Sequence, residues 1–237
     1  MTYYQGVSEF NVMDQLIKPD IFNGDVKAFF TGKSLGANTE KISNLLSISK
    51  QDIYLPVQKH TDQVLVLQSD LTPVTADAVV TQRKGILLGV RVADCVPILL
   101  YDRGKSIVGA VHAGWRGTAS QIMKKTVQTM VELFGSVPED IMVATGPSIR
   151  WQCYDVGSEV KEAVCEATGE GTYCISKKEK YFIDLSSANR IQALSSGIPG
   201  ENIWSSSECT RCNPDAFYSY RYSKTYAGSQ GGFIGVF

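Results

Sequence analysis

The chain has 237 residues, of which 43% are hydrophobic and 20% charged, so it can bury a sizeable core without disulfide or metal staples. Its formal net charge of -1, from 23 basic and 24 acidic residues, excludes a global basic field that would draw it to nucleic acid or an anionic membrane. The first residues, MTYYQGVSEF, lack the basic and apolar regions of a secretory signal, and no run approaches the roughly 18 apolar residues of a membrane helix.

The six cysteines are scattered along a chain that can fold without them, which is typical of proteins in a reducing compartment. We therefore expect a cytoplasmic protein that acts on small molecules. No nucleic-acid partner, membrane or obligate protein partner is indicated.

The predicted elements are short strands with fewer helices between them. In chain order they are a strand at 26–31, a weak helix at 38–46, strands at 53–57, 64–68, 78–81, 86–90, 97–101 and 106–112, a helix at 118–134, a strand at 141–145, a helix at 158–168, a strand at 181–184, a helix at 186–196 and a strand at 232–236. Strands outnumber helices and several follow one another directly. This pattern predicts an α+β fold with mixed sheets and outer helices, rather than a regular βαβ alternation.

Two histidines and one cysteine form a candidate metal site. His60 lies in PVQKHTDQV at a turn between strands, Cys95 in RVADCVPILLYD at the start of a strand, and His112 in SIVGAVHAGWRGT where a strand ends. Two imidazoles and a thiolate suit zinc and leave a fourth position open for water or substrate. Asp94 is placed to orient an imidazole. Spacing alone favours a different interpretation, in which Cys95 is a small buried residue and the histidines are loop residues.

The segments around these residues resemble a known family. QKHTDQV, ADCVPILLYD, HAGWRGT, GPSIRWQCYDVG and CTRCNPDAFYSYR resemble, in order, five blocks of the laccase-domain or "multicopper polyphenol oxidoreductase" family, which is described as bacterial purine nucleoside phosphorylases. The resemblance implies a zinc ion on His60, Cys95 and His112, with copper as an alternative. It also implies one domain, 1–237, folded as a four-layer α/β/β/α sandwich with mixed sheets. The chain departs from the family at Gln152, Tyr222 and Ser229, and these changes remove cations near the presumed pocket.

Other residues are candidates for substrate binding. Arg116 lies two residues before Thr118, the predicted helix N-cap, and an arginine there favours bound phosphate. The alternative is that the Arg116 stem packs on Trp115. Cys153 and Tyr154 follow GPSI in a loop and are candidates to line the pocket, although a buried structural thiol is the more frequent role for a cysteine such as Cys153.

A second cysteine motif has no evident function from sequence. Cys209 and Cys212 form a lone C-x-x-C, which could be half of a zinc site or a redox pair. The sequence offers no second pair and no spare histidine. We therefore interpret the motif as loop architecture.

Three enzyme functions compete. The resemblance implies phosphorolysis of adenosine, inosine and S-methyl-5'-thioadenosine by inorganic phosphate, with an adenosine deaminase side activity and with Cys95, Asp94 and Arg116 as catalytic candidates. The second is a copper oxidase, because two histidines and a cysteine also suit copper. A multi-copper enzyme needs further histidines, and the chain has only two. The third is a hydrolase with Cys95 as nucleophile and a histidine as base, as in a toxin glutamine deamidase whose fold the family's fold resembles. A purely structural protein is the remaining alternative.

Overall fold

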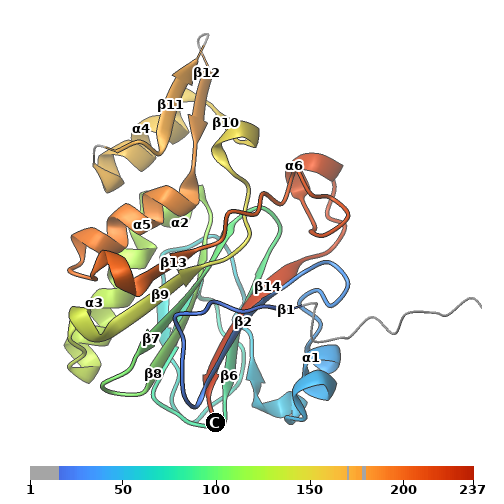
Figure 1. Ribbon diagram of the computed structural model, residues 1–237, viewed down its shortest axis with the longest axis vertical. Helices are drawn as coiled ribbons and strands as arrows, with labels where there is room; N and C mark the ends of the chain where they lie inside the picture. Colours follow the sequence, from blue (N-terminus) through green and yellow to red (C-terminus); the bar gives the residue numbers. More distant parts are fainter. Residues whose placement is uncertain (1–15, 170, 178–179) are drawn as a thin grey trace, which may run out of the picture.

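The computed structural model describes residues 16–169, 171–177 and 180–237 (Figure 1). The segment 1–15, on which the expectation about a secretory signal falls, lies outside the described residues, so that expectation and the domain bounds 1–237 stay predictions. Within the described part, no helix is long and apolar enough to cross a membrane.

Fourteen strands and six α-helices are described in these ranges. The strands are β1 (Leu16–Ile17), β2 (Val26–Thr31), β3 (Ile53–Tyr54), β4 (Val64–Val66), β5 (Ala78–Thr81), β6 (Leu87–Val92), β7 (Val96–Asp102), β8 (Ile107–Ala113), β9 (Ile141–Thr145), β10 (Asp155–Val156), β11 (Cys174–Lys177), β12 (Lys180–Ile183), β13 (Ile203–Ser205) and β14 (Gln230–Val236). The helices are α1 (Thr39–Leu46), α2 (Trp115–Ala119), α3 (Ile122–Phe134), α4 (Ser158–Thr168), α5 (Leu185–Ser195) and α6 (Tyr220–Ser223).

The strands form two large mixed sheets and one small sheet. One large sheet has the order β1-β2-β14-β6-β3, and the other has the order β13-β9-β7-β8-β5-β4. The small antiparallel sheet, β10-β12-β11, stands at one end of the molecule beside α4 (Figure 1).

Alternating side chains on the strands build three apolar layers. In β2, Phe29 packs with Ile42 of α1, whereas the next residue, Phe30, packs between the two large sheets. In β7, Leu99 faces the other sheet, while Ile98 and Leu100 face the outer helices. Because successive strand residues point to opposite faces, continuous apolar runs fill the layers on both sides of each sheet.

Helices cover the two outer faces, with α1 on one side and α3 and α5 on the other (Figure 1). Helix α1 begins where the Asn38 side chain accepts hydrogen bonds from the N–H groups of Glu40 and Lys41, both at 3.0 Å. The fold is thus the expected α/β/β/α sandwich with mixed sheets.

The predicted helix at 118–134 is wrong in one respect, because the structure has two helices there. Gln121 adopts a left-handed conformation with φ 60°, which ends α2 and lets α3 begin at Ile122. The first of these helices begins at Trp115, after an N-cap at Gly114, so Thr118 is a buried helix residue and not an N-cap. The short strands β1, β10, β11 and β13 and helix α6 were not predicted, since two to four residues carry no readable periodicity.

Candidate metal centre

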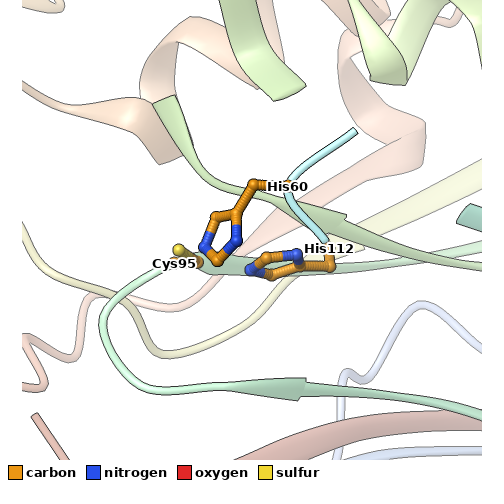
Figure 2. A group of neighbouring side chains, drawn as sticks. All are labelled: His60, Cys95 and His112. Atoms are coloured by element: carbon orange, nitrogen blue, oxygen red, sulfur yellow. The ribbon is translucent and has the colours of Figure 1, made fainter. Parts of the chain in front are cut away.

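Three segments bring His60, Cys95 and His112 to one end of the six-stranded sheet, and their side chains face one another (Figure 2). Their ligand atoms lie within 4.8 Å of one another, and the two imidazole rings are 4.8 Å apart between centroids. We call this set the His–Cys–His centre. The structure thus brings together the three residues that the sequence singled out.

Sheet pairing explains the convergence. On β8, His112 pairs with Pro97 of β7, and the neighbouring Ala113 pairs with Val96. Cys95 directly precedes Val96, so it stands beside the end of β8. On the other side of β8, Val111 pairs with Ala78 of β5, which places Asp77 next to His112.

Asp77 is a buried carboxylate that the sequence did not single out, and it fixes two of the three ligands. Its side chain is fully buried, and its Oδ1 lies 2.7 Å from Nδ1 of His112. Because Nδ1 is held by the carboxylate, Nε2 is the nitrogen of His112 left free to bind a metal. The expectation that Asp94 orients an imidazole is therefore wrong for His112.

The same carboxylate holds the turn that carries His60. Asp77 accepts hydrogen bonds from the backbone N–H groups of Lys59, His60 and Thr61 at 3.1, 3.0 and 2.7 Å, and from the Thr61 hydroxyl at 2.8 Å. His60 itself has a φ of 59°, a conformation that is costly for a residue with a side chain. The bonds to Asp77 offset that cost and direct the His60 ring toward Cys95.

Asp94 has a different task next to Cys95. Its carboxylate accepts hydrogen bonds from the Thr210 hydroxyl at 2.7 Å and from the Arg221 backbone N–H at 2.6 Å. Its own backbone is left-handed, with φ 83°, and its carbonyl accepts from the Ile149 N–H at 2.9 Å. Asp94 therefore connects the loop of Ile149 and the segment of Thr210 and Arg221 to the strand start that carries Cys95.

The charges in the centre favour metal binding. Burial would raise the pKa of the Cys95 thiol, but the charge of His112 and the contacts with both imidazoles lower it to about 6. Burial would lower the pKa of His112, but the charge of Cys95 and the bond to Asp77 raise it to about 9. The shift of the Cys95 pKa favours its thiolate, which is the form that binds a metal, and a bound metal would displace the proton from Nε2 of His112.

The donor set and its geometry fit a zinc ion. One thiolate and two imidazoles are typical catalytic-type ligands, and zinc holds such atoms at about 2.0–2.3 Å. The ligand atoms already lie within 4.8 Å of one another, and Asp77 keeps His112 in one tautomer. His60 is exposed on one side, so a fourth position is open to the cavity described next.

A cavity of about 790 Å³ opens over the centre, and all three ligands line it. That volume suits a small-molecule substrate. Its charged lining is mainly cationic, since Arg91, Arg116 and Arg221 contribute to it and Asp94 is the one carboxylate among its lining residues. Arg91 was not singled out from the sequence, because no local pattern marks it, and Arg221 ends the block CTRCNPDAFYSYR but was not assigned a role there. They supply cations despite the family departures at Tyr222 and Ser229.

The structure shows the packing of Arg116 on Trp115, and the role of Arg116 in phosphate binding stays a prediction. Its guanidinium carbon lies 4.4 Å from the centre of the Trp115 ring, and its side chain lines the cavity. Tyr154 also lines the cavity, and the guanidinium of Arg221 lies 5.1 Å from its ring centre. Tyr154 and Trp115 therefore place aromatic surface beside cationic groups.

Cys153 is not among the residues that line this cavity, and its role in substrate binding stays a prediction. Its side chain is buried with Ile149 and Cys209, and its Sγ lies 3.2 Å from Sγ of Cys212. The loop turns at Trp151–Cys153, so Tyr154 faces the cavity while Cys153 faces away from it. Gln152 lies within this turn and is exposed.

Gly114 leaves the room that the centre needs. A Cβ atom at this position would stand 3.0 Å from Cys95 Sγ and 3.3 Å from His60 Cδ2. We expect Gly114→Ala to weaken metal binding by about 10-fold or more, as for disturbed supporting groups at metal sites. Isothermal titration of the metal-free variant with zinc measures this loss.

Gly200→Ala is the matched control for that substitution. A Cβ at Gly200 meets nothing closer than 3.7 Å, and this glycine lies in a turn before β13. Unchanged zinc affinity in Gly114→Ala would show that the centre adapts to the added methyl group and would contradict the prediction.

Comparisons with known proteins agree with this geometry. A family model described as multi-copper polyphenol oxidoreductase laccase matches residues 24–237. The chain is 36% identical over 224 residues to a purine nucleoside phosphorylase of Clostridium acetobutylicum, covering 92% of this chain and 93% of that protein. It is 38% identical over 189 residues to adenosine deaminase RL5 from an unknown prokaryotic organism, covering 74% and 72% of the two chains.

A solved structure shows the same fold. The crystal structure of YlmD from Geobacillus stearothermophilus superimposes with a TM-score of 0.86 at 28% identity, covering 92% of this chain and 94% of that chain.

Proposed function

This chain belongs to the multi-copper polyphenol oxidoreductase laccase family, and we propose that it is a zinc-dependent purine nucleoside phosphorylase. The proposed substrates are adenosine, inosine and S-methyl-5'-thioadenosine together with inorganic phosphate. Adenosine deamination is the proposed side activity. Relatives named purine nucleoside phosphorylase and adenosine deaminase support both reactions.

The observation that carries the proposal is the combination of the His–Cys–His centre with a cationic, partly aromatic cavity. A nucleoside offers a flat base and a polar sugar, and phosphate adds negative charge. Trp115 and Tyr154 provide surfaces for the base. Arg91, Arg116 and Arg221 provide the donors for phosphate.

In this proposal His60, Cys95 and His112 hold the zinc ion. When bound, zinc supplies a Lewis acid that polarises the substrate and lowers the pKa of water for deamination. Asp77 keeps Nε2 of His112 directed at the ion. In phosphorolysis a phosphate oxygen forms a bond to C1' of the ribose while the bond from C1' to the base nitrogen breaks.

The arginines would position phosphate against the ribose. Arg116 is held over Trp115, and Arg221 is held by Asp155 at 2.8 Å, so both guanidinium groups have restricted motion. Fixed donors of this kind stabilise an anion without reorganising. Asp94 stays a predicted proton carrier, and its two hydrogen bonds also give it a role in positioning the Thr210 loop.

Incubation of the purified protein with adenosine, with and without phosphate, tests the proposal. We expect adenine and ribose 1-phosphate in the presence of phosphate, and inosine as a slower product in either condition. Chromatography separates the three purines. Inosine alone in both conditions would make the protein a deaminase, and the absence of adenine and inosine would refute both activities.

Arg116→Ala tests where phosphate binds. A charge-assisted hydrogen bond contributes about 1.5–3 kcal/mol, so its loss is expected to raise the KM for phosphate about 10- to 100-fold. The KM for adenosine should change much less. Initial rates over a range of phosphate concentrations give both values.

Arg103→Ala is the control for that variant. Arg103 pairs with Asp140 at 3.2 Å on the surface and does not line the cavity. Equal changes in the KM for phosphate and for adenosine in Arg116→Ala would show that this arginine does not bind phosphate specifically.

Copper chemistry is the second candidate function, favoured by the ligand set itself. The two histidines of the chain both belong to the His–Cys–His centre, which leaves no imidazole for further copper ions. We therefore propose zinc rather than copper as the resident metal. Metal analysis of protein purified without added metal tests this, and stoichiometric copper with a strong thiolate-to-copper absorption would overturn it.

We also propose that the protein acts in the cytoplasm, without a protein partner. All six cysteines are free thiols, which supports a reducing compartment.

A further inference from the structure

Three cysteines outside the His–Cys–His centre meet in one place. Cys153 follows β9 in the chain, whereas Cys209 and Cys212 lie between β13 and α6, yet their sulfur atoms all lie within 4.8 Å of one another. Cys153 supplies the partner that the lone C-x-x-C motif lacked in the sequence. We call these residues the three-cysteine cluster.

The loops around the cluster are held by backbone bonds. The N–H of Thr210 donates to the carbonyl of Ser148 at 3.1 Å, and the N–H of Asn213 donates to the carbonyl of Cys209 at 3.2 Å. Cys153 and Cys209 are buried, each with 8% of its surface exposed, and Cys212 is exposed. The cluster therefore has two buried cysteines and one that solvent can reach.

Hydrogen-bond donors surround the sulfur atoms. The backbone N–H of Arg150 donates to Sγ of Cys209 at 3.5 Å, and the Arg211 guanidinium donates to Sγ of Cys153 at 3.5 Å. Such donors stabilise thiolates, which are the form of cysteine that binds metal.

The charges of the cluster are suited to a divalent ion. Three thiolates around a divalent ion leave one net negative charge, and the positive guanidinium of Arg211 contacts Cys153 to compensate it. Among the described residues, no carboxylate or imidazole belongs to this group of sulfur atoms. A ligand set of thiolates alone selects soft ions such as zinc or copper(I) over magnesium or calcium.

We propose that the three-cysteine cluster binds one thiophilic metal ion, with zinc as the expected ion and solvent in its fourth position. This site is separate from the His–Cys–His centre and does not depend on the proposed activity.

A metal ion explains the cluster better than a disulfide bond does. The sulfur atoms of Cys153 and Cys212 are 3.2 Å apart and are thiols, and a disulfide between them would leave Cys209 unused. Cys209 accepts the backbone N–H of Arg150 at 3.5 Å. An ion uses all three sulfurs and the donors around them.

The ion would connect two loops that shape the substrate cavity. Ile149 and Tyr154 flank Cys153 and line the cavity, and Thr210 beside Cys209 bonds to Asp94 next to the catalytic metal. A metal ion bound at the three-cysteine cluster would therefore stabilise the two loops that form this part of the cavity wall.

Titration of the reduced, metal-free full-length protein with cadmium tests this site. Cadmium replaces zinc in thiolate sites and gives an ultraviolet thiolate-to-metal absorption. We expect two equivalents to bind to the wild type and one to Cys212→Ser. Cys174→Ser removes a half-buried thiol outside both sites and is expected to keep two equivalents.

A thermal test separates the two sites. In His60→Ala the catalytic site is damaged, yet zinc should still raise the Tm, because the three-cysteine cluster is intact. In the double variant His60→Ala with Cys212→Ser that rise should disappear. One cadmium equivalent in the wild type, two in Cys212→Ser, or an equal rise in Tm in both His60→Ala proteins would overturn the proposal.

Discussion

Replacing Cys95 with alanine is expected to remove one equivalent of zinc and the phosphorolytic activity together. Cys95 is the only thiolate of the His–Cys–His centre, and both histidine rings face it. Loss of a supporting group alone lowers metal affinity or activity about 10- to 100-fold, so loss of the thiolate ligand should exceed 100-fold. Metal analysis after gel filtration and the adenosine assay with phosphate measure the two effects in one preparation.

The same variant separates the metal enzyme from a cysteine hydrolase. A nucleophilic Cys95 paired with His112 would also be lost in Cys95→Ala, but the metal content would then stay unchanged. As much zinc in the inactive variant as in the wild type, or a covalent acyl-enzyme on Cys95 in the wild type, would favour the hydrolase. Cys174→Ser is the control, because this thiol lies on β11 away from the cavity.

Asp77→Asn is expected to weaken both the metal centre and the fold. The carboxylate accepts hydrogen bonds from His112 and from the turn at Lys59–Thr61. In asparagine an NH2 group replaces one of its oxygens, so N–H groups would face each other and some of these hydrogen bonds would be lost. We expect a loss of about 10- to 100-fold in zinc affinity. Breaking a buried charged pair of this kind costs about 3–5 kcal/mol of stability. Denaturant unfolding of the chelated protein measures the second effect without the metal.

The pH dependence of that stability gives a separate test. Burial would raise the pKa of Asp77, but its bonds to His112 and to the His60 turn lower it well below its ordinary value of 3.8. The stabilisation is therefore fully present above pH 3.8 and is lost as the pH falls toward the folded pKa. In acid the stability of the wild type should approach that of Asp77→Asn.

A surface aspartate provides the control for Asp77. Asp140 pairs with Arg103 on the surface, and Asp140→Asn should change stability by no more than about 0.5 kcal/mol. His60→Ala should lose the zinc of the His–Cys–His centre and keep most of its stability, since the backbone of the turn still bonds to Asp77. Equal stability of Asp77→Asn and Asp140→Asn would contradict the role given to Asp77.

The sequence predicted those strands and helices whose apolar residues form a clear run or a regular repeat. Apolar runs such as 78–81 and 141–145 became strands with those bounds, and the helix at 158–168 became α4. The three metal ligands were also predicted, but mainly because the surrounding blocks resemble a known family. Their convergence depends on the pairing of β8 with β5 and β7, which no local pattern encodes.

What the sequence did not predict depends on contacts between distant residues. Asp77 precedes an ordinary apolar strand, and only the register of β5 against β8 places it beside His112. Cys153 joins Cys209 only because the loop after β9 runs beside the loop after β13, where Ser148 bridges to Cys209. The break at Gln121 is a single left-handed residue within a continuous helical pattern.

The position of β14 has a consequence for how the chain folds. This strand lies in the middle of the five-stranded sheet, where Gly232 pairs with Phe30 of β2 on one side and with Val90 of β6 on the other. Pairing across such a long stretch of sequence makes folding slow, because a large loop must close first. Until β14 arrives, β2 and β6 each expose an unpaired edge that can capture strands from other molecules. Aggregation during synthesis should therefore respond to conditions that delay β14 more than to changes in the metal centre.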